Sequence, residues 1–269
     1  MRRSRARWIA PCVAAAVCLA PAGATGAITP LNTKRTATGL AEAISAQRGL
    51  VTRAWFATVP PTGRPAAVAT TRLAGFPRPT PSDGSYAILS TGDATLAGTR
   101  NTSTYLGRET GGPSIRGAFD VVILRIDVRV PSGHSCLSFD ARLLSDEYRE
   151  AIGTAYGDVF LAELGVSNWE VLTAPAPGVV APFNLATTGG GALMTITKDG
   201  FSAMSPAASA GTTYDGATGI VRVAAPIAPG SRTLYLSIFD RGDHLYDSSV
   251  FVDNLRTRAG GACATRVLG

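Results

Sequence analysis

Apolar and polar residues alternate along most of the chain after its first third, which is the pattern of strands with one buried face. The pattern is clearest in 120–144, where Val122, Leu124 and Ile126 fall on one face and charged residues fall on the other. Turn residues, Pro-Ser-Gly, interrupt the segment at 131–133, and the alternation then resumes. The pattern therefore predicts a β-hairpin over 120–144.

Shorter segments repeat the same pattern. Strands are predicted at 51–59, 85–90, 158–164, 192–197, 219–224, 233–239 and 249–256. Between them, 174–192 and 200–217 are rich in Gly, Ala, Pro, Ser and Thr, a composition typical of surface loops. Short strands separated by turn residues predict an all-β fold, an antiparallel β-sandwich of jelly-roll type.

One short helix is expected near the N-terminus. Leu40 and Ile44 have helical spacing within 38–48, and Gly49 follows as a stop signal. The next segment, 57–82, contains six prolines and should form irregular or edge structure, because proline cannot donate a hydrogen bond to a neighbouring strand.

The chain divides into four parts by composition. They are a signal peptide (1–24), a helix, strand and Pro-rich segment packed on the main domain (25–82), the β-sandwich (83–258) and a C-terminal tail held by a disulfide (259–269).

The first 24 residues have the layout of a secretory signal peptide. Four arginines precede an apolar stretch at 8–20, and small residues at 22–24 predict cleavage after Ala24 or Ala27. The apolar stretch is shorter than the roughly 20 residues that span a bilayer. We therefore expect a secreted, extracellular protein, with a retained N-terminal anchor as the alternative.

Removal of this segment changes the charge balance. Four of the 25 Lys and Arg residues leave with it, so 21 basic residues face 19 acidic ones and the net charge falls from +6 to +2. The rest of the chain has no run of basic residues and no basic helix. We expect no nucleic-acid partner and no membrane insertion after cleavage.

Two cysteines follow the signal peptide, Cys136 and Cys263. In an oxidising compartment two cysteines predict a disulfide, and two free thiols are the alternative. The bond would tie the C-terminal tail to a central strand and contribute roughly 4 kcal/mol by the chain-entropy model.

An acidic segment, 237–255, reads SIFDRGDHLYDSSVFVDNL and predicts a calcium site formed by Asp240, Asp243, Asp247 and Asp253. Calcium takes about six to eight oxygen ligands, and the first three aspartates lie in one loop between predicted strands. Asp253 shares a strand face with apolar residues, so an ion, an arginine or backbone amides must compensate its charge. The alternative is a solvated acidic turn with a salt-bridged Asp253.

A second acidic segment, LLSDEYREAIGTAYGDVF, predicts a ligand-binding edge. Its residues are Asp146, Glu147, Tyr148, Glu150 and Asp158. Carboxylates there would accept hydroxyl groups and tyrosines would offer flat apolar faces, so the expected partner is an extracellular glycan or protein. A single helical turn with exposed acids explains the same residues.

No catalytic residue is predicted. The chain lacks a Gly-x-Ser-x-Gly elbow and the His and Cys spacings of zinc sites. Two alternatives stay open: a Ser/His/Asp triad using His244 with Asp240 or Asp247, and a hydrolase of an extracellular polymer using paired carboxylates from 146–158 and 240–253.

Two short motifs carry no function by themselves. Residues 241–243 match the Arg-Gly-Asp adhesion tripeptide, and residues 101–103 match the N-glycosylation sequon. Both patterns are frequent by chance.

Several blocks, in this order along the chain, resemble the choice-of-anchor L domain of secreted and surface-attached bacterial proteins. The blocks are 85–107, 120–150, 156–164, 210–218 and 234–255. The resemblance covers the chain from about Thr36 to Leu255. The block SDEYRE usually carries two glutamates and a proline, and Asp146 and Arg149 depart from that pattern here. No C-terminal anchor of the kind that gives the family its name is recognised.

The resemblance implies an extracellular β-sandwich module of the kind found with adhesins. It favours binding over catalysis and supplies no catalytic residue.

Overall fold

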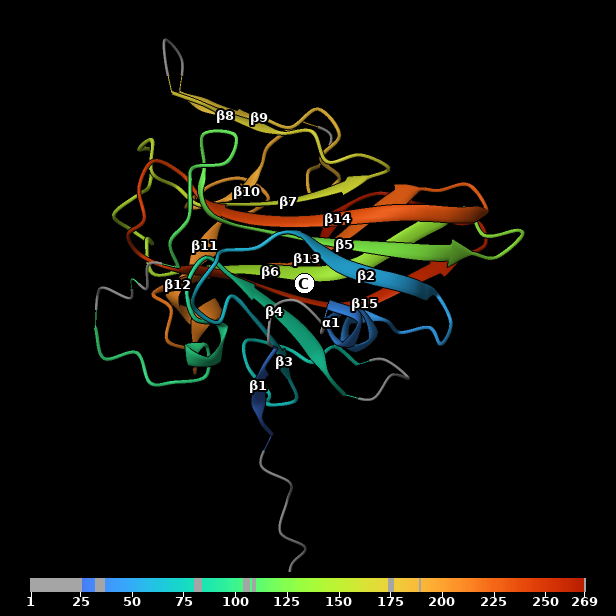
Figure 1. Cartoon of the computed structure of the whole chain (residues 1–269), viewed down its shortest axis with the longest axis horizontal. Helices are drawn as coiled ribbons and strands as arrows, with labels where there is room; N and C mark the ends of the chain where they lie inside the picture. Colours follow the sequence, from blue (N-terminus) through green and yellow to red (C-terminus); the bar gives the residue numbers. More distant parts are fainter. Residues whose placement is uncertain are drawn as a thin grey trace, which may run out of the picture.

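The structure is a computed structural model that describes residues 26–31, 37–79, 84–103, 107, 110–173, 177–188 and 190–268. The predicted signal peptide, 1–24, lies outside these residues. Two sheets lie one above the other, and all pairs of named strands are antiparallel (Figure 1). The predicted all-β antiparallel sandwich with one short helix is confirmed, and its jelly-roll order stays a prediction.

The first sheet has nine strands. Along its main path they are β1 (Ile28–Pro30), β3 (Ala66–Ala69), β4 (Tyr86–Ser90), β15 (Ser248–Arg258), β6 (Cys136–Ser145), β12 (Gly216–Thr218) and β11 (Met204–Ser205). Two more strands lie off this path, β13 (Ile220–Pro226) beside β6 and β16 (Arg266–Leu268) beside β13.

The second sheet has five strands. In order they are β10 (Met194–Thr195), β7 (Val159–Leu164), β14 (Gly230–Asp240), β5 (Phe119–Val130) and β2 (Val51–Thr58). A separate ribbon of β8 (Glu170–Leu172) and β9 (Gly178–Val180) covers part of its outer face, where Trp169 stacks on Phe239. Two 3₁₀ turns complete the elements, η1 (Ala94–Leu96) and η2 (Pro206–Ser209).

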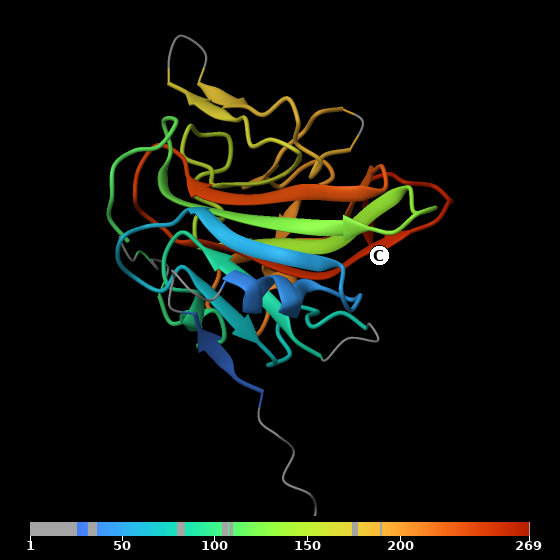
Figure 2. The same ribbon diagram turned by 45° about the vertical axis from the view of Figure 1, so that its right-hand side comes forward.

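The main core lies between the two sheets. Alternate residues of β5 and β14, such as Leu124 and Leu236, meet inward-facing residues of β6 and β15, such as Phe139 and Val252. The helix α1 (Ala37–Ile44) closes one side of the sandwich and contacts β2, β3, β4 and β15 (Figure 2). Its apolar face joins the same core, which explains why this short helix is stable in the folded chain.

The hairpin predicted over 120–144 is wrong. β5 pairs with β14 and β2, whereas β6 pairs with β15, β13 and β12, so the two segments lie in different sheets. The chain crosses between the sheets at Ser135, whose N–H donates to the carbonyl of Arg258 at 2.9 Å. Alternation shows only that a strand buries one face, and strands of both sheets do so here.

The helix ends four residues before the predicted position, at Ile44 rather than Arg48. Beyond it Ser45 forms an isolated bridge with Leu255, and the N–H of Ala46 donates to the carbonyl of Leu255 at 2.9 Å. The backbone is therefore bonded to β15 where the sequence pattern would continue the helix. Within the Pro-rich segment, 66–69 forms β3 between β1 and β4.

The structure contains the predicted disulfide, Cys136–Cys263, with a sequence separation of 127 residues. Cys136 begins β6, and Cys263 follows β15. The bond therefore holds the C-terminal tail against the first sheet.

Candidate functional site

One end of the sandwich collects strand ends from both sheets. β4, β6 and β14 end there, and β5, β7 and β15 begin there, as the pairs Ser90–Ser249, Ser145–Ser248 and Asp240–Phe119 show. The segments 146–158 and 241–247 join the two sheets at this end, on the left in Figure 1. Both acidic segments found in the sequence therefore lie together.

Six carboxyl groups are buried at this end, each at most 4% exposed. They are Asp120, Asp146, Glu147, Asp158, Asp240 and Asp247, and we call them the acidic end. Electrostatic interactions connect Asp158 to Glu147, Asp240 and Asp247, and Asp240 to Asp120. The fold thus concentrates carboxyl groups in a place from which water is largely excluded.

Backbone hydrogen bonds fix the positions of these acids. The N–H of Asp158 donates to Glu147 Oε2 at 2.8 Å, and the N–H of Arg241 donates to Asp158 Oδ1 at 3.3 Å. The N–H of Asp146 donates to the carbonyl of Asp247 at 3.2 Å. The two connecting segments are therefore bonded to each other at the acids.

Buried hydroxyl groups surround the acids. Thr91 accepts the N–H of Ser248 at 2.9 Å, and Thr110 donates to Asp120 Oδ1 at 2.5 Å. Tyr214 Oη lies 2.5 Å from the hydroxyl of Ser249. All of these side chains are buried, so the neighbourhood is rich in neutral oxygen atoms as well as carboxylates.

The central acids lack a basic side chain. Among the residues that the structure describes, no Lys, Arg or His side chain comes within 4.0 Å of the carboxylates of Glu147, Asp158 or Asp240. Asp120 differs, because His244 Nδ1 lies 3.0 Å from its Oδ2. A buried carboxyl without such a partner tends to keep its proton, because burial disfavours the charged form.

Burial raises the pKa of all three groups. It raises the pKa of Glu147 to about 11, with the charge of Asp158 as the next cause, and it raises the pKa of Asp158 to about 8. The pKa of Asp240 is also well above its usual range, through burial and then the charge of Asp158. Side-chain hydrogen bonds with Ser248 and with Asp240 oppose the rise of the pKa of Asp158.

An open pocket of about 120 Å³ adjoins the acidic end. It is lined by Glu147, Glu150, Ala151, Thr154, Tyr156, Asp243 and Tyr246. The Tyr156 ring is 49% exposed, and Glu150 is also exposed. Carboxylates and aromatic faces therefore meet solvent together at this place.

Three of the four predicted calcium ligands lie in or beside this region. Asp240 and Asp247 are buried in the acidic end, and Asp243 lies at the pocket, where its Oδ1 accepts the N–H of Leu245 at 3.0 Å.

Asp253 lies elsewhere. It is six residues along β15 from Asp247, about 20 Å in an extended strand, and it pairs in register with Asp140. Its Oδ2 accepts the N–H of Arg78 at 2.7 Å, and its Oδ1 accepts the N–H of Asn254. Of the compensating groups expected for Asp253, backbone amides are present.

The five predicted ligand-binding residues divide into two groups. Asp146, Glu147 and Asp158 are buried, whereas Glu150 is exposed at the pocket. Tyr148 is half-buried and packs closely against Gly216, where an added Cβ would lie 2.5 Å from its ring. Tyr148 therefore fills space between segments, and Tyr156 is the tyrosine that lines the pocket.

The residues of the alternative catalytic triad and of the two short motifs can also be located in the structure. His244 pairs with Asp120 rather than with Asp240 or Asp247, and within the described ranges no serine hydroxyl is hydrogen-bonded to it. In the Arg-Gly-Asp tripeptide Gly242 lies close to the Tyr156 ring, and Asn101 of the sequon donates to Asp215 at 2.7 Å.

Sequence reasoning missed Asp120, Thr91, Ser248 and Gly92. Asp120 immediately precedes a run of apolar residues in the sequence, as Asp158 does, and that shared position was the available signal. The hydroxyl residues gave no signal of their own, because serine and threonine are common throughout the chain.

The absence of a side chain at Gly92 leaves space for the Asp247 carboxylate. A Cβ atom at Gly92 would lie 1.9 Å from Asp247 Oδ2, closer than two non-bonded atoms can approach. Gly92→Ala must therefore displace a buried carboxylate, and we expect it to lower the free energy of unfolding by about 1–3 kcal/mol in urea titrations.

Gly39→Ala is the matched control for Gly92→Ala. Gly39 lies in α1 with no atom within 4 Å of an added Cβ, so this change should leave stability equal or slightly higher. Equal destabilisation by both changes would show that the contact with Asp247 is not the cause.

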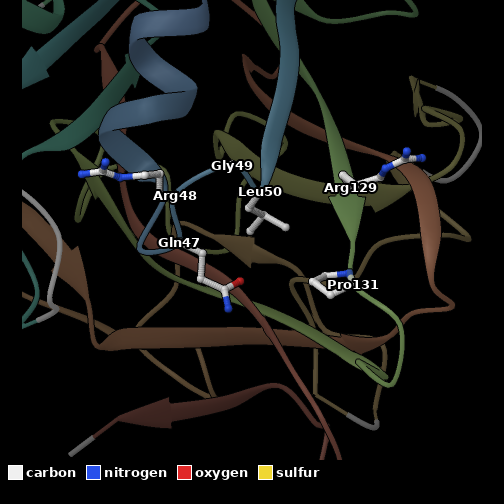
Figure 3. Close-up of a pocket in the computed structure, with 6 residues that line it drawn as sticks. All are labelled: Gln47, Arg48, Gly49, Leu50, Arg129 and Pro131. Atoms are coloured by element: carbon white, nitrogen blue, oxygen red, sulfur yellow. The ribbon is translucent and has the colours of Figure 1, made fainter.

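A second pocket lies at the opposite end of β5 and has a volume of about 260 Å³. Arg48 and Arg129 line it, but their side chains extend to opposite sides (Figure 3). Gln47 is already bonded to the backbone of Thr257, at 2.7 Å and 3.0 Å. The pocket thus does not focus its two charges on one point.

Searches of protein-family models and of curated proteins found no match to this chain. Within the described ranges, no group of three or more His, Cys, Asp or Glu side chains is gathered closely enough to hold a metal ion. The described helix α1 is too short to cross a membrane, and no other described helix is long and apolar enough to do so.

Proposed function

We propose that the protein is a secreted bacterial β-sandwich module of jelly-roll type, similar to choice-of-anchor L domains, with a binding or structural role outside the cell. The observation that supports this most directly is the pocket of Tyr156, Glu150 and Asp243 beside the acidic end. Strand ends of both sheets support that pocket, which is the usual placement of a binding site on a rigid scaffold.

The chemistry of the pocket suits a glycan. The exposed Tyr156 ring offers an apolar face for a sugar ring, and carboxylates of Glu150 and Asp243 accept hydroxyl groups. Neutral, hydroxyl-rich ligands are preferred over anionic ones, because the carboxylates of Glu150 and Asp243 in the pocket wall repel anions. In this proposal a bound calcium ion stabilises the loops at the same end.

A glycan-array screen of the exported chain tests the proposal. Tyr156→Ala and Glu150→Gln should each weaken binding of the selected glycan by about tenfold or more. The matched control is Phe183→Ala, which removes an aromatic ring of similar exposure, 48%, outside the pocket. Binding that depends on Phe183 and not on Tyr156, or binding of proteins alone, would contradict the glycan assignment.

One observation favours a second function, a hydrolase acting on an extracellular polymer. Burial holds the pKa of Glu147 at about 11 and that of Asp158 at about 8, so two adjacent carboxyls have separated pKa values, as in acid–base pairs. A hydrolase should release soluble fragments from its polymer, and Glu147→Gln should abolish release while binding persists. Binding without any release by the unchanged protein supports the binding module instead.

A further inference from the structure

The β8–β9 ribbon covers only part of the outer face of the second sheet. It packs on Val121, Leu161 and Phe239, toward the acidic end, and lies over the left part of the sheet in Figure 1. Farther along β2, β5 and β14 the outward side chains are half-buried or exposed and meet solvent. We call this part the arginine face, and its residues are Arg53, Trp55, Arg125, Asp127, Arg129 and Tyr235.

Strand pairing brings the residues of the arginine face together from distant parts of the chain. Arg125 of β5 pairs with Trp55 of β2 on one side and with Tyr235 of β14 on the other. Arg53 pairs with Asp127 in the next outward row. The arginines are therefore neighbours in the fold although the sequence has no run of basic residues.

Aromatic rings hold two of the guanidinium groups in place. Arg125 Cζ lies 4.2 Å from the centroid of the Trp55 ring and 5.6 Å from that of Tyr235, and Arg53 Cζ lies 4.6 Å from the Trp55 centroid. A ring covers the flat face of a stacked guanidinium, whereas the N–H donors lie at its edge. The arginines are thus positioned to donate to oxygen atoms of an anion, and less side-chain freedom is lost when the anion binds.

The positive charges of the arginine face exceed the negative ones. Asp127 Oδ1 accepts a hydrogen bond from Arg125 Nε at 3.2 Å. Within the described part of the chain no carboxylate lies within 4.0 Å of Arg53 or Arg129, and both arginines are exposed. Glu163, the next acid across the sheet, is fully buried. Three arginines therefore stand beside one partly exposed aspartate.

We propose that the arginine face binds an acidic polysaccharide, whose carboxylate or sulfate groups are held by Arg53, Arg125 and Arg129. Arg129 follows Arg125 by four residues on the same face of β5, about 13 Å in an extended strand. This spacing suits a polymer with repeated charges better than a single small anion. The surface is separate from the Tyr156 pocket, and the choice of a polysaccharide rests on the extracellular location in the proposed function.

Two other polyanionic partners fit the arginine face less well. Single-stranded nucleic acids stack their bases on aromatic rings, but the Trp55 ring is already stacked by two guanidinium groups. Proteins that lie on a membrane surface insert apolar side chains among the lipids. Within the described ranges, none of the large exposed apolar side chains belongs to β2, β5 or β14. Charge complementarity without apolar anchors therefore favours a hydrated, anionic carbohydrate chain.

Calorimetric titration of the exported chain with two acidic polymers tests this proposal. Polygalacturonate supplies carboxylates and dextran sulfate supplies sulfates, so the pair also identifies the preferred anion. Methyl-esterified polygalacturonate and plain dextran are the uncharged counterparts and should not bind. Arg53→Gln and Arg129→Gln should each weaken binding of the acidic polymer by about threefold, and the double variant by about tenfold or more. Added salt should also weaken binding, because ions screen exposed charges.

Arg266→Gln is the matched control, since Arg266 is an exposed arginine in β16 of the first sheet and its loss removes the same charge. Its affinity should equal that of the unchanged protein, and melting temperatures verify that all variants fold. Failure of both acidic polymers to bind, or equal weakening by Arg266→Gln and the double variant, would overturn the proposal. Equal or tighter binding of DNA or of anionic lipid vesicles would overturn the choice of a polysaccharide.

The two proposed binding surfaces can be tested independently of each other. Tyr156→Ala should leave binding of the acidic polymer unchanged, because Tyr156 lines the pocket and is not part of the arginine face. The double arginine variant should in turn keep its affinity for the glycan selected by the pocket. Loss of both activities in either variant would contradict the separation of the two surfaces.

Discussion

Asp140→Ala is expected to lower the free energy of unfolding by about 3–5 kcal/mol, because it leaves a partly buried cation without its counter-ion. Arg222 donates two hydrogen bonds to the fully buried Asp140, and Arg78 Nε lies 3.4 Å from its Oδ2. Asn254 donates a further bond from the bulge in β15. Urea titration of the unchanged and substituted proteins measures the difference.

Asp127→Ala is the matched control for this prediction. Asp127 also pairs with an arginine, Arg125 at 3.2 Å, but both side chains are partly exposed, at 25% and 32%. Exposed ion pairs contribute little, so the expected loss is about 1 kcal/mol or less. Similar losses at the two positions would show that burial does not distinguish the two pairs.

The Asp140 network and the acidic end are two different uses of buried acid in one fold. At Asp140 the chain supplies its own cations and the side-chain amide of Asn254. Arg78 connects the 72–79 segment to the first sheet there, and Arg142 of β6 adds a second connection by donating to the carbonyl of Ala74. At the acidic end the central carboxylates have no such partner among the described residues. The first arrangement pairs its acid with cations, whereas burial raises the pKa of the central acids in the second.

The fold class was predictable because strand alternation is a local property. The residues of β5 and β14 that face the core, such as Leu124 and Leu236, are apolar at every second position, and this needs no knowledge of their neighbours. The pairing of strands was not predictable in the same way. Whether residues after Pro131 return to β5 or join β15 depends on hydrogen bonds at Ser135, which the alternation does not record.

The candidate site was predictable in part for a similar reason. Asp240 and Asp247 are close in sequence, so their common loop could be read directly, and the cluster around Glu147 was equally visible. These two segments meet at one end because β6 and β15 lie in the first sheet, β7 and β14 lie in the second, and both connections between the sheets are made at that end. For Asp253 the prediction was wrong. Asp253 is close to Asp247 in sequence, but an extended strand carries it away from Asp247.

The buried acids Asp158 and Glu147 predict that the free energy of unfolding, measured in chelator, decreases as the pH rises. Asp158 has a pKa of about 8 in the folded protein and the usual value of 3.8 when unfolded, and Glu147 changes from 4.5 to about 11. Between about pH 4 and pH 8 the unfolded chain therefore loses protons that the folded chain keeps. The stabilising contribution is complete below about pH 4 and is lost as the pH rises, by up to about 1.4 kcal/mol per pH unit for each such group.

Thermal unfolding in chelator at several pH values between about 5 and 8 checks this expectation, and the melting temperature should fall as the pH rises. The charged and titratable groups that interact with Asp158 or Glu147 are Asp240, Arg241, Asp243 and Asp247, besides the two acids themselves. Asp120 interacts with Asp240, His244 with Asp120, and Asp146 with Tyr214. Most of them are acids, so ionisation of one carboxyl is opposed by the others and the fall is not offset locally.

Asp158→Asn provides the control, because the amide does not titrate and the slope should decrease by the share of one group. A melting temperature that stays constant or rises between about pH 5 and pH 8 in chelator would contradict the assignment of neutral, protonated acids at this end.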